Sequence, residues 1–176
     1  MNKTSIKSII MCATFSAMII VGAYIRIPIP PVPLTMQTFF VLLSGMVLGP
    51  RLGVCSILIY IALGVVGLPV FSGGTAGISS IMMPTFGYAI GFIPAVYVSG
   101  RISGNSYKSL LLSALVAMSI IYVCGAGYYL LLEQAVMGND IRISEFLISF
   151  FALSIPKDVA VCFAVATIAK RLRATL

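Results

Sequence analysis

Six long apolar stretches constrain the fold of this chain more than any other feature of its sequence. A helix of about 20 apolar residues can cross a hydrocarbon core roughly 30 Å thick. Hydrophobic residues make up 60% of the 176 positions and charged residues only 9%, which leaves too little polar surface for a water-soluble protein. We therefore predict an all-α integral membrane bundle of six transmembrane helices, forming a single transmembrane domain over residues 1–176. The stretches are Ile9–Ile25, Gln37–Leu48, Leu52–Leu68, Pro84–Val98, Leu110–Leu132 and Phe146–Ala169.

The basic residues predict how this bundle is oriented, because cytoplasmic loops collect Lys and Arg. Arg26 and Arg142 fall on one side of the predicted bundle, and Lys157 lies within the last apolar stretch. We therefore expect both termini to be cytoplasmic. We interpret the first stretch as a helix and not a cleaved signal peptide, because no small-residue cleavage site precedes Tyr24. The other eight of the eleven basic residues fall on the opposite side: Lys3, Lys7, Arg51, Arg101, Lys108, Lys170, Arg171 and Arg173.

Several functional classes fit this sequence poorly. The net charge of +7 is spread along one membrane face and is not clustered with stacking aromatic residues, so we do not expect nucleic acid as a partner. The chain has no histidine and no CxxC pair, so we expect neither a metal site nor an enzymatic acid–base centre, and no cofactor. No phosphate-binding loop is present, so ATP hydrolysis would need a partner. We expect four cysteines to be small core residues: Cys12, Cys55, Cys124 and Cys162.

Lys157 and Asp158 follow Pro156 in the middle of the last apolar stretch. A charge at the centre of a membrane helix costs about 2.5–3.5 kcal/mol on insertion scales, so such residues usually face a cavity and serve a function. Successive residues of a helix point about 100° apart. We therefore expect Lys157 and Asp158 not to pair with each other, and each to serve another group.

Two non-helical segments are predicted to lie on the outer side. Arg26–Pro33 has four prolines in six positions and cannot continue a helix, whereas Gly67–Gly77 is rich in glycine yet apolar. Irregular backbone at membrane depth is tolerated where it is packed in protein or lines a cavity. We expect both segments to be walls or lids of an outward-facing pocket. For Arg26–Pro33, a stiff linker between two helices is an equal alternative.

Three ordered blocks of this sequence resemble one known family. They are Pro31–Gly53, which contains PVPLTMQTFF and LGPRLG, then Gly67–Gly74 with GLPVFSGG, and Pro84–Phe92 with PTFGYAIGF. Together with Pro156 and Asp158, they are similar to BioY, the biotin-specific substrate-binding subunits of energy-coupling factor transporters. Members of the family often carry glycine between that proline and aspartate, where this chain has Lys157.

The resemblance implies a six-helix membrane protein of the cell membrane that captures biotin from outside with high affinity. It also implies partners, namely a transmembrane coupling subunit and two ATPase subunits, and a single substrate-binding domain. In related subunits a face of small residues on the first helix docks the coupling subunit, and Ala13 and Ala17 match that face. The alternative function is a small proton-coupled vitamin carrier that acts alone and uses Asp158 as its relay.

Biotin has two ureido N–H donors, a ureido carbonyl, an apolar sulfur-containing ring and an anionic valerate tail, and its site must match all of these. We expect Asp158 to accept from the ureido N–H groups, with Gln37 or Tyr88 assisting. Lys157 would donate to the ureido carbonyl or neutralise the tail, and Arg26 is the other candidate for the tail.

The apolar ring of biotin requires an aromatic or aliphatic wall. We expect this wall to be formed by Phe71, Tyr122 and the glycine-rich backbone around Gly73 and Gly74.

Overall fold

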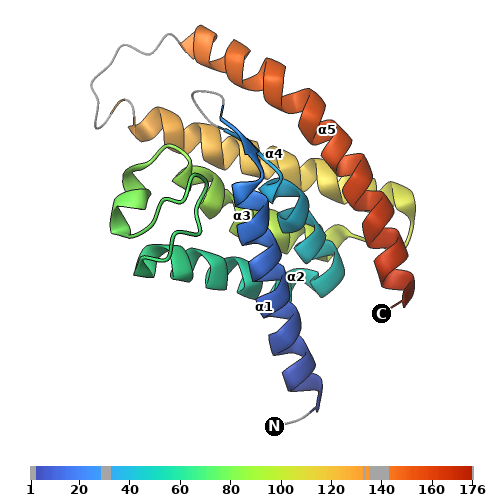
Figure 1. The fold of residues 1–176 in the computed structure, drawn as a ribbon. Coiled ribbons are helices and arrows are strands. Elements are labelled where there is room, and N and C mark those ends of the chain that lie inside the picture. The colour runs from blue at the N-terminus through green and yellow to red at the C-terminus, as the bar shows by residue number, and fades with distance from the viewer. Residues whose placement is uncertain (1–2, 29–32, 133, 135–142, 176) are drawn as a thin grey trace.

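The computed structural model describes residues 3–28, 33–132, 134 and 143–175, with side chains for 6–28, 33–132, 134 and 154–174. Five helices form the bundle, and α5 lies across its outside (Figure 1). Two short strands and one 3-10 helix accompany the helices, so the predicted all-α class holds apart from this small ribbon. The helices are α1 (Lys3–Tyr24), α2 (Gln37–Val66), α3 (Phe86–Ile102), α4 (Tyr107–Leu132) and α5 (Ile143–Thr175); the other elements are β1 (Arg26–Ile27), β2 (Leu34–Thr35) and η1 (Ile78–Met82).

Two of the predicted stretches join in α2, so six expected stretches fall on five helices. The junction is Gly49, whose φ of 78° and ψ of 178° are non-helical, followed at once by Pro50. Among the described residues, α1, α2 and α4 are long and apolar enough to cross a membrane, and α3 is a shorter apolar helix. The count of six membrane spans stays a prediction.

Small residues allow α2, α3 and α4 to approach closely. A Cβ atom on Gly45 would lie 2.7 Å from the Val96 carbonyl oxygen of α3, and one on Gly91 would lie 2.8 Å from Cys124 Cβ of α4. Close approach through small side chains is the usual way in which helices pack within membranes. The Gly87–Gly91 face of α3 therefore serves packing inside the bundle.

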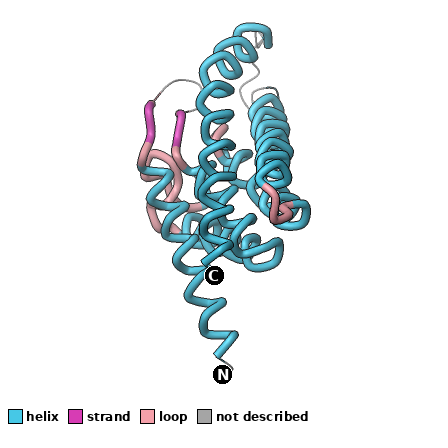
Figure 2. Tube along the Cα trace, turned by 90° about the vertical axis from the view of Figure 1, so that its right-hand side faces the viewer, coloured by secondary structure: helices cyan, strands magenta, loops and turns pink. Residues whose placement is uncertain are grey.

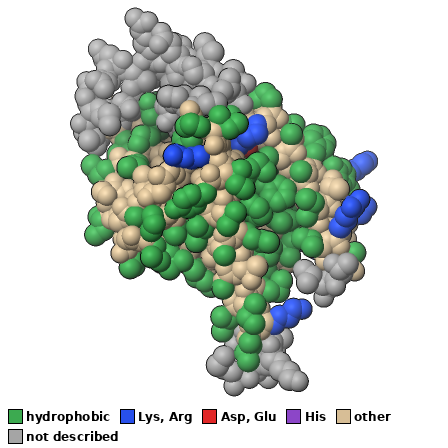
Figure 3. Space-filling view, viewed as in Figure 1, with side chains coloured by type: hydrophobic (Ala, Val, Ile, Leu, Met, Phe, Trp, Pro, Cys, Tyr) green, Lys and Arg blue, Asp and Glu red, His purple; other side chains and the backbone are tan. Residues whose placement is uncertain are grey.

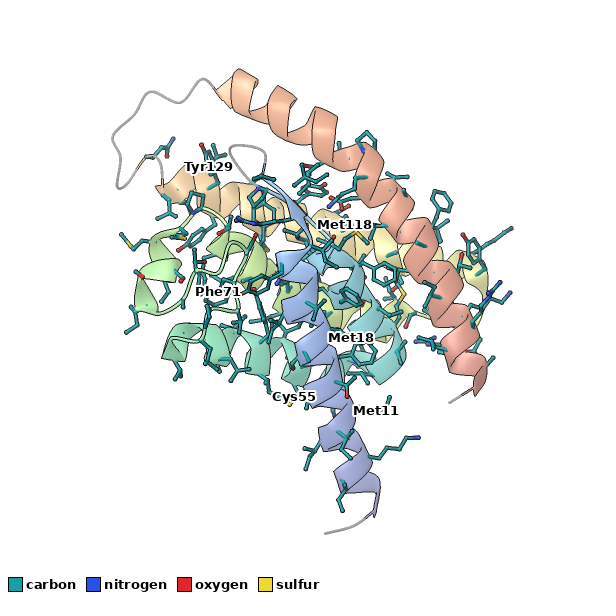
Figure 4. The ribbon with its side chains drawn as sticks, viewed as in Figure 1. Met11, Met18, Cys55, Phe71, Met118 and Tyr129 are labelled. Atoms are coloured by element: carbon teal, nitrogen blue, oxygen red, sulfur yellow. The ribbon has the colours of Figure 1, made fainter. Side chains whose placement is uncertain are left out.

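The glycine-rich segment after α2 folds back onto the helices as an ordered loop (Figure 2). Gly67 ends α2 in the left-handed conformation with φ of 115°, and the amide of Gly77 donates to the Gly64 carbonyl at 2.8 Å. The hydroxyl of Tyr24 in α1 donates to the Pro69 carbonyl. Phe71 is turned inward from this loop and is only 5% exposed (Figure 4).

The proline-rich segment is described only at its two ends, and residues 29–32 lie outside the described residues. The ends pair as an antiparallel ribbon in which Arg26 is opposite Thr35 and Ile27 is opposite Leu34. This ribbon connects the end of α1 to the start of α2.

Large apolar side chains cover much of the visible surface (Figure 3), as expected for helices surrounded by hydrocarbon. Examples that are more than half exposed are Ile9, Val21, Val66, Val123 and Leu131. Cys12 and Cys162 are buried, and Cys124 is half-buried. The prediction for Cys55 was wrong, because this side chain is exposed on the outward face of α2.

Both termini lie toward one end of the bundle in two perpendicular views (Figures 1 and 2). At this end α2 bends, α3 ends, α4 begins and α5 ends, so Arg51, Arg101 and Lys108 gather there. Arg142 lies outside the described residues. Whether this end faces the cytoplasm stays a prediction.

Candidate functional site

A hollow lies between the helices near the β1–β2 ribbon, opposite the end that carries the termini. It contains about 700 Å³ of empty space, counting its open mouth. Its lining comes from β2, α2, the loop after α2, α3, α4 and α5. The lining residues are Pro33, Leu34, Thr35, Gln37, Thr38, Tyr60, Phe71, Ser72, Thr75, Ser80, Thr85, Phe86, Tyr88, Ala89, Phe92, Tyr122, Ser154, Lys157 and Asp158.

Asp158 is a buried carboxylate at this hollow, only 5% exposed, and its side chain joins three helices. One carboxylate oxygen accepts a hydrogen bond from the hydroxyl of Tyr122 in α4. The other lies 3.4 Å from Thr38 Oγ1 of α2. Of the side chains that the structure describes, Asp158 is the sole carboxylate.

Lys157 pairs with Asp158, which corrects the expectation that the two would not face each other. Its Nζ lies 2.8 Å from Asp158 Oδ1 and donates to the Thr35 carbonyl at 2.9 Å. The 100° offset applies to the Cα–Cβ directions, whereas the flexible four-carbon stem of lysine lets its ammonium group return toward the neighbouring carboxylate. Pairing also lowers the cost of keeping two charges within an apolar stretch.

Aromatic rings form one continuous wall of the hollow. Phe71 makes edge-to-face contacts with Tyr60 and Phe86, at ring-centroid distances of 5.4 and 5.8 Å. Phe71 can enter the bundle because Gly64 of α2 has no side chain; a Cβ atom there would lie 2.2 Å from the Phe71 ring. Tyr88 and Tyr122 also line the hollow.

Three buried polar atoms at the hollow have no hydrogen-bond partner within the described part of the chain. They are Gln37 Nε2, Ser72 Oγ and Ser80 Oγ. A buried polar group without a partner costs about 1–3 kcal/mol. Each of the three can donate a hydrogen bond, so a ligand with acceptor oxygens would satisfy them.

Three expected site residues lie outside the lining of the hollow. Gly73 and Gly74 are in the loop between Ser72 and Thr75, which do line it, and they take φ of 88° and 73°. A Cβ atom on Gly73 would lie 2.7 Å from Arg26 Nη1, so the exposed guanidinium of Arg26 packs on this turn. Arg26 is thus at the rim of the hollow, opposite Thr35 in the ribbon.

The structure brings together Asp158, Lys157, Gln37, Tyr88, Phe71 and Tyr122, all of which line the hollow. Sequence reasoning missed other lining residues, of which two had a readable signal. Ser154 lies four residues before Asp158, on the same face of α5, and Thr38 follows Gln37 directly. Ser72 lies within the segment Gly67–Gly77 that was expected to form a wall or lid, but nothing in the sequence singled out its side chain or that of Ser80, because their burial depends on how the loop folds back.

The expected docking residues Ala13 and Ala17 are both exposed on α1. Four positions apart, they share one outward face of the helix. Neither contributes to the hollow.

Known proteins of similar sequence are named as transporters. "Probable biotin transporter BioY" from Lysinibacillus sphaericus is 38% identical over 176 residues, which cover 98% of this chain and 89% of that protein. A protein of the same name from Pyrococcus horikoshii is 47% identical over 119 residues, 68% of this chain and 72% of that one. "Biotin transporter BioY" from Thermotoga maritima is 40% identical over 121 residues, which cover 68% of this chain and 72% of that protein.

A solved structure has the same fold. It is the crystal structure of the S-component for biotin from an ECF-type ABC transporter, and it superimposes with a TM-score of 0.84 at 26% sequence identity. The match covers 99% of this chain and 94% of that one. The model of the BioY family matches residues 1–176, so this chain belongs to the BioY family.

Proposed function

We propose that this chain is the biotin-binding S subunit of an ECF-type ABC transporter, a multi-pass protein of the cell membrane that forms one substrate-binding domain. The names of its relatives and the S-component fold support this proposal. The observation that carries it is the pair formed by half-buried Lys157 and buried Asp158, which faces a hollow with three unpartnered hydrogen-bond donors. The function is capture of a ligand, not catalysis.

The Lys157–Asp158 pair matches the edge of the ureido ring. In a cyclic urea the N–H donor and the carbonyl acceptor lie side by side. The carboxylate of Asp158 and the ammonium group of Lys157, 2.8 Å apart, present an acceptor beside a donor in the same way. Asp158 accepts from a ureido N–H and Lys157 donates to the ureido oxygen, so the acceptor and the donor are used together.

The valerate tail is assigned to the unpartnered donors and not to Lys157. A tail carboxylate beside Lys157 would also lie beside Asp158, and two like charges at that distance repel. Gln37 Nε2, Ser72 Oγ and Ser80 Oγ can donate to it, and Arg26 at the rim adds a positive charge. The rings of Tyr60, Phe71, Tyr88, Phe86 and Tyr122 enclose the apolar ring of biotin, with Gly73 and Gly74 shaping the loop behind Phe71.

The energising partners are a transmembrane coupling subunit and two ATPase subunits. Ala13 and Ala17 provide a flat, exposed face on α1 for the coupling subunit. The chain crosses the membrane six times when the two halves of α2 are counted separately, so both termini lie on the same side. Most basic residues lie on that side too, which makes it the cytoplasmic side, and the hollow then opens toward the outside.

Calorimetry on the purified protein, after removal of any ligand that copurifies, tests the proposal. Biotin should bind tightly. A biotin amide, which lacks the tail charge, and 2-iminobiotin, which lacks the ureido oxygen, should each bind at least about tenfold more weakly, because a lost hydrogen bond to a charged group costs about 1.5–3 kcal/mol. Equal binding of thiamine or riboflavin, or no heat with biotin, would refute the assignment.

Reconstitution in liposomes separates this function from a proton-coupled carrier. The subunit alone should bind biotin at the membrane without accumulating it, with or without a pH gradient. Accumulation driven by a pH gradient, with no ATPase present, would favour the carrier.

A further inference from the structure

The guanidinium group of Arg173 joins three elements at the end of the bundle far from the hollow. Arg173 lies in the last turn of α5. Its Nε donates to the Met46 carbonyl of α2 at 2.6 Å, and its Nη1 lies 2.9 Å from the Gly104 carbonyl and 3.2 Å from the Ser103 carbonyl. Its Nη2 donates to Ser103 Oγ at 2.6 Å.

Three of these acceptors are carbonyl groups that their own helices leave without a donor. Met46 lies four residues before Pro50, which has no N–H to give, and α2 departs from helical geometry at Gly49. Ser103 and Gly104 follow the end of α3, where the last carbonyls have no intrahelical partner. A planar guanidinium with five donors can serve all of them at once, which a lysine cannot do.

Among the side chains that the structure describes, Arg173 is a polar attachment of the far end of α5 to the rest of the bundle. Another attachment is the Lys157–Asp158 pair, bonded to β2, α2 and α4. The two attachments are fifteen residues apart, about 22 Å along a helix. Between them, the buried face of α5 is apolar and mostly small: Val161, Cys162, Val165, Ala166 and Ala169.

The packing between α5 and α4 is incomplete. An apolar groove with about 960 Å³ of empty space, its open side included, runs between them and is lined by Ile155, Val159 and Cys162 from α5. Asp158 and Tyr122 border this groove as well as the hollow. A rotation of α5 would therefore displace the carboxylate, and the apolar seam alone offers little resistance to it.

We infer that Arg173 is a positioning residue that latches the far end of α5 to the bend of α2 and the end of α3, and thereby holds Asp158 and Lys157 in their binding arrangement. Part of this inference rests on the proposed function, because its effect is measured with biotin. The latch also implies that a movement of the α2 bend or of the α3–α4 connection is passed along α5 to the site.

Arg173→Gln tests the latch, with Arg173→Lys as the conservative variant. Lys170→Gln is the matched control, because it removes one positive charge from an exposed side chain of the same helix. In ligand-free protein, amide hydrogen exchange of Arg173→Gln should rise in residues 161–175 and 103–106 and stay unchanged in α1. The biotin affinity should fall about tenfold, as expected when the competent arrangement becomes less populated. Arg173→Lys should recover part of both effects.

Several results would overturn the inference. Unchanged exchange in α5 would show that no latch exists, and faster exchange with an unaltered biotin affinity would show that the latch does not position the site. An equal effect of Lys170→Gln would show that the lost positive charge, and not the lost hydrogen bonds of Arg173, causes the change.

If Arg173→Gln does not fold, Ser103→Ala provides a second test. It removes one acceptor and should shift both hydrogen exchange and biotin affinity in the same direction by a smaller amount; no shift would refute the latch. If native protein binds no biotin, the proposed function fails, while hydrogen exchange still decides whether the latch exists.

Discussion

Asp158 illustrates how one charged residue can link a site to its scaffold. Its carboxylate accepts from Tyr122 of α4, approaches Thr38 of α2 and pairs with Lys157, so three elements meet at one buried group. Removing one partner of a buried pair leaves the other charge uncompensated. A change of this side chain should therefore affect both the proposed ligand binding and the packing of α5.

Asp158→Asn should weaken biotin binding by about 100-fold, because hydrogen bonds to a charged group contribute about 1.5–3 kcal/mol each. The amide keeps the size of the carboxylate but loses its charge, and Lys157 loses its partner. Calorimetry measures the affinity, and thermal unfolding shows whether the variant is folded. The control is Ser119→Ala, an exposed position on α4 whose hydroxyl bonds only within its own helix among the described contacts. Native affinity in folded Asp158→Asn would exclude Asp158 from the site.

At the scale of elements, the loop after α2 is a structured wall of the site. It is held by the left-handed Gly67, by the bond from Gly77 to Gly64 and by the hydroxyl of Tyr24. These attachments set the position of Phe71, whose ring fits against Gly64. Several of its backbone amides donate within the protein, which suits a loop that lines an apolar site.

Gly64→Ala should displace Phe71, because the new methyl group would lie 2.2 Å from the ring. We expect biotin affinity to fall about tenfold and the protein to lose about 1–3 kcal/mol of stability, the usual cost of overpacking a core. Gly127→Ala is the matched control, since apart from its chain neighbours and the backbone of its own helix no described atom lies within 4 Å of the added Cβ, and α4 is helical there. Calorimetry and thermal unfolding of both variants measure the difference. Equal behaviour of the two variants would show that the Gly64–Phe71 contact does not shape the site.

At the scale of the whole molecule, the proposed binding site and the proposed docking face occupy different regions. The hollow lies near the β1–β2 ribbon, whereas Ala13 and Ala17 are exposed on the outer face of α1 and line no part of it. Capture of biotin and assembly with the coupling subunit should therefore be separable by mutation.

Ala13→Trp and Ala17→Trp should abolish copurification with the coupling and ATPase subunits, because a bulky ring prevents close approach of helices. Biotin binding by the isolated subunit should stay within about twofold of native, since distant independent sites behave nearly additively. Ala164→Trp, on the exposed face of α5, is the control for a bulky ring on the membrane surface. Loss of biotin capture with assembly intact would contradict the docking role.

Much of the fold and part of the site were readable in the sequence. The apolar stretches located the helices, and the charges inside the last stretch indicated a functional cavity, because hydrocarbon penalises a charge wherever it occurs. The bend at Gly49–Pro50 and the irregular loop from Gly67 to Gly77 followed from local backbone chemistry in the same way. These features depend on residues that are close along the chain.

Features that depend on distant residues needed the tertiary structure. The ion pair between Lys157 and Asp158 is stabilised by the Thr35 carbonyl, and the Met46 carbonyl left free by Pro50 is satisfied by Arg173, 127 residues away. Which serines of the loop become buried donors, and which cysteine faces outward, depend equally on how the elements pack. Local sequence determined where helices form and where a charge must be sheltered, because those energies arise within one segment. Only the packed bundle decided which groups shelter it, because hydrogen-bond partners in a membrane protein come from whichever backbone carbonyl or side chain the fold brings within reach.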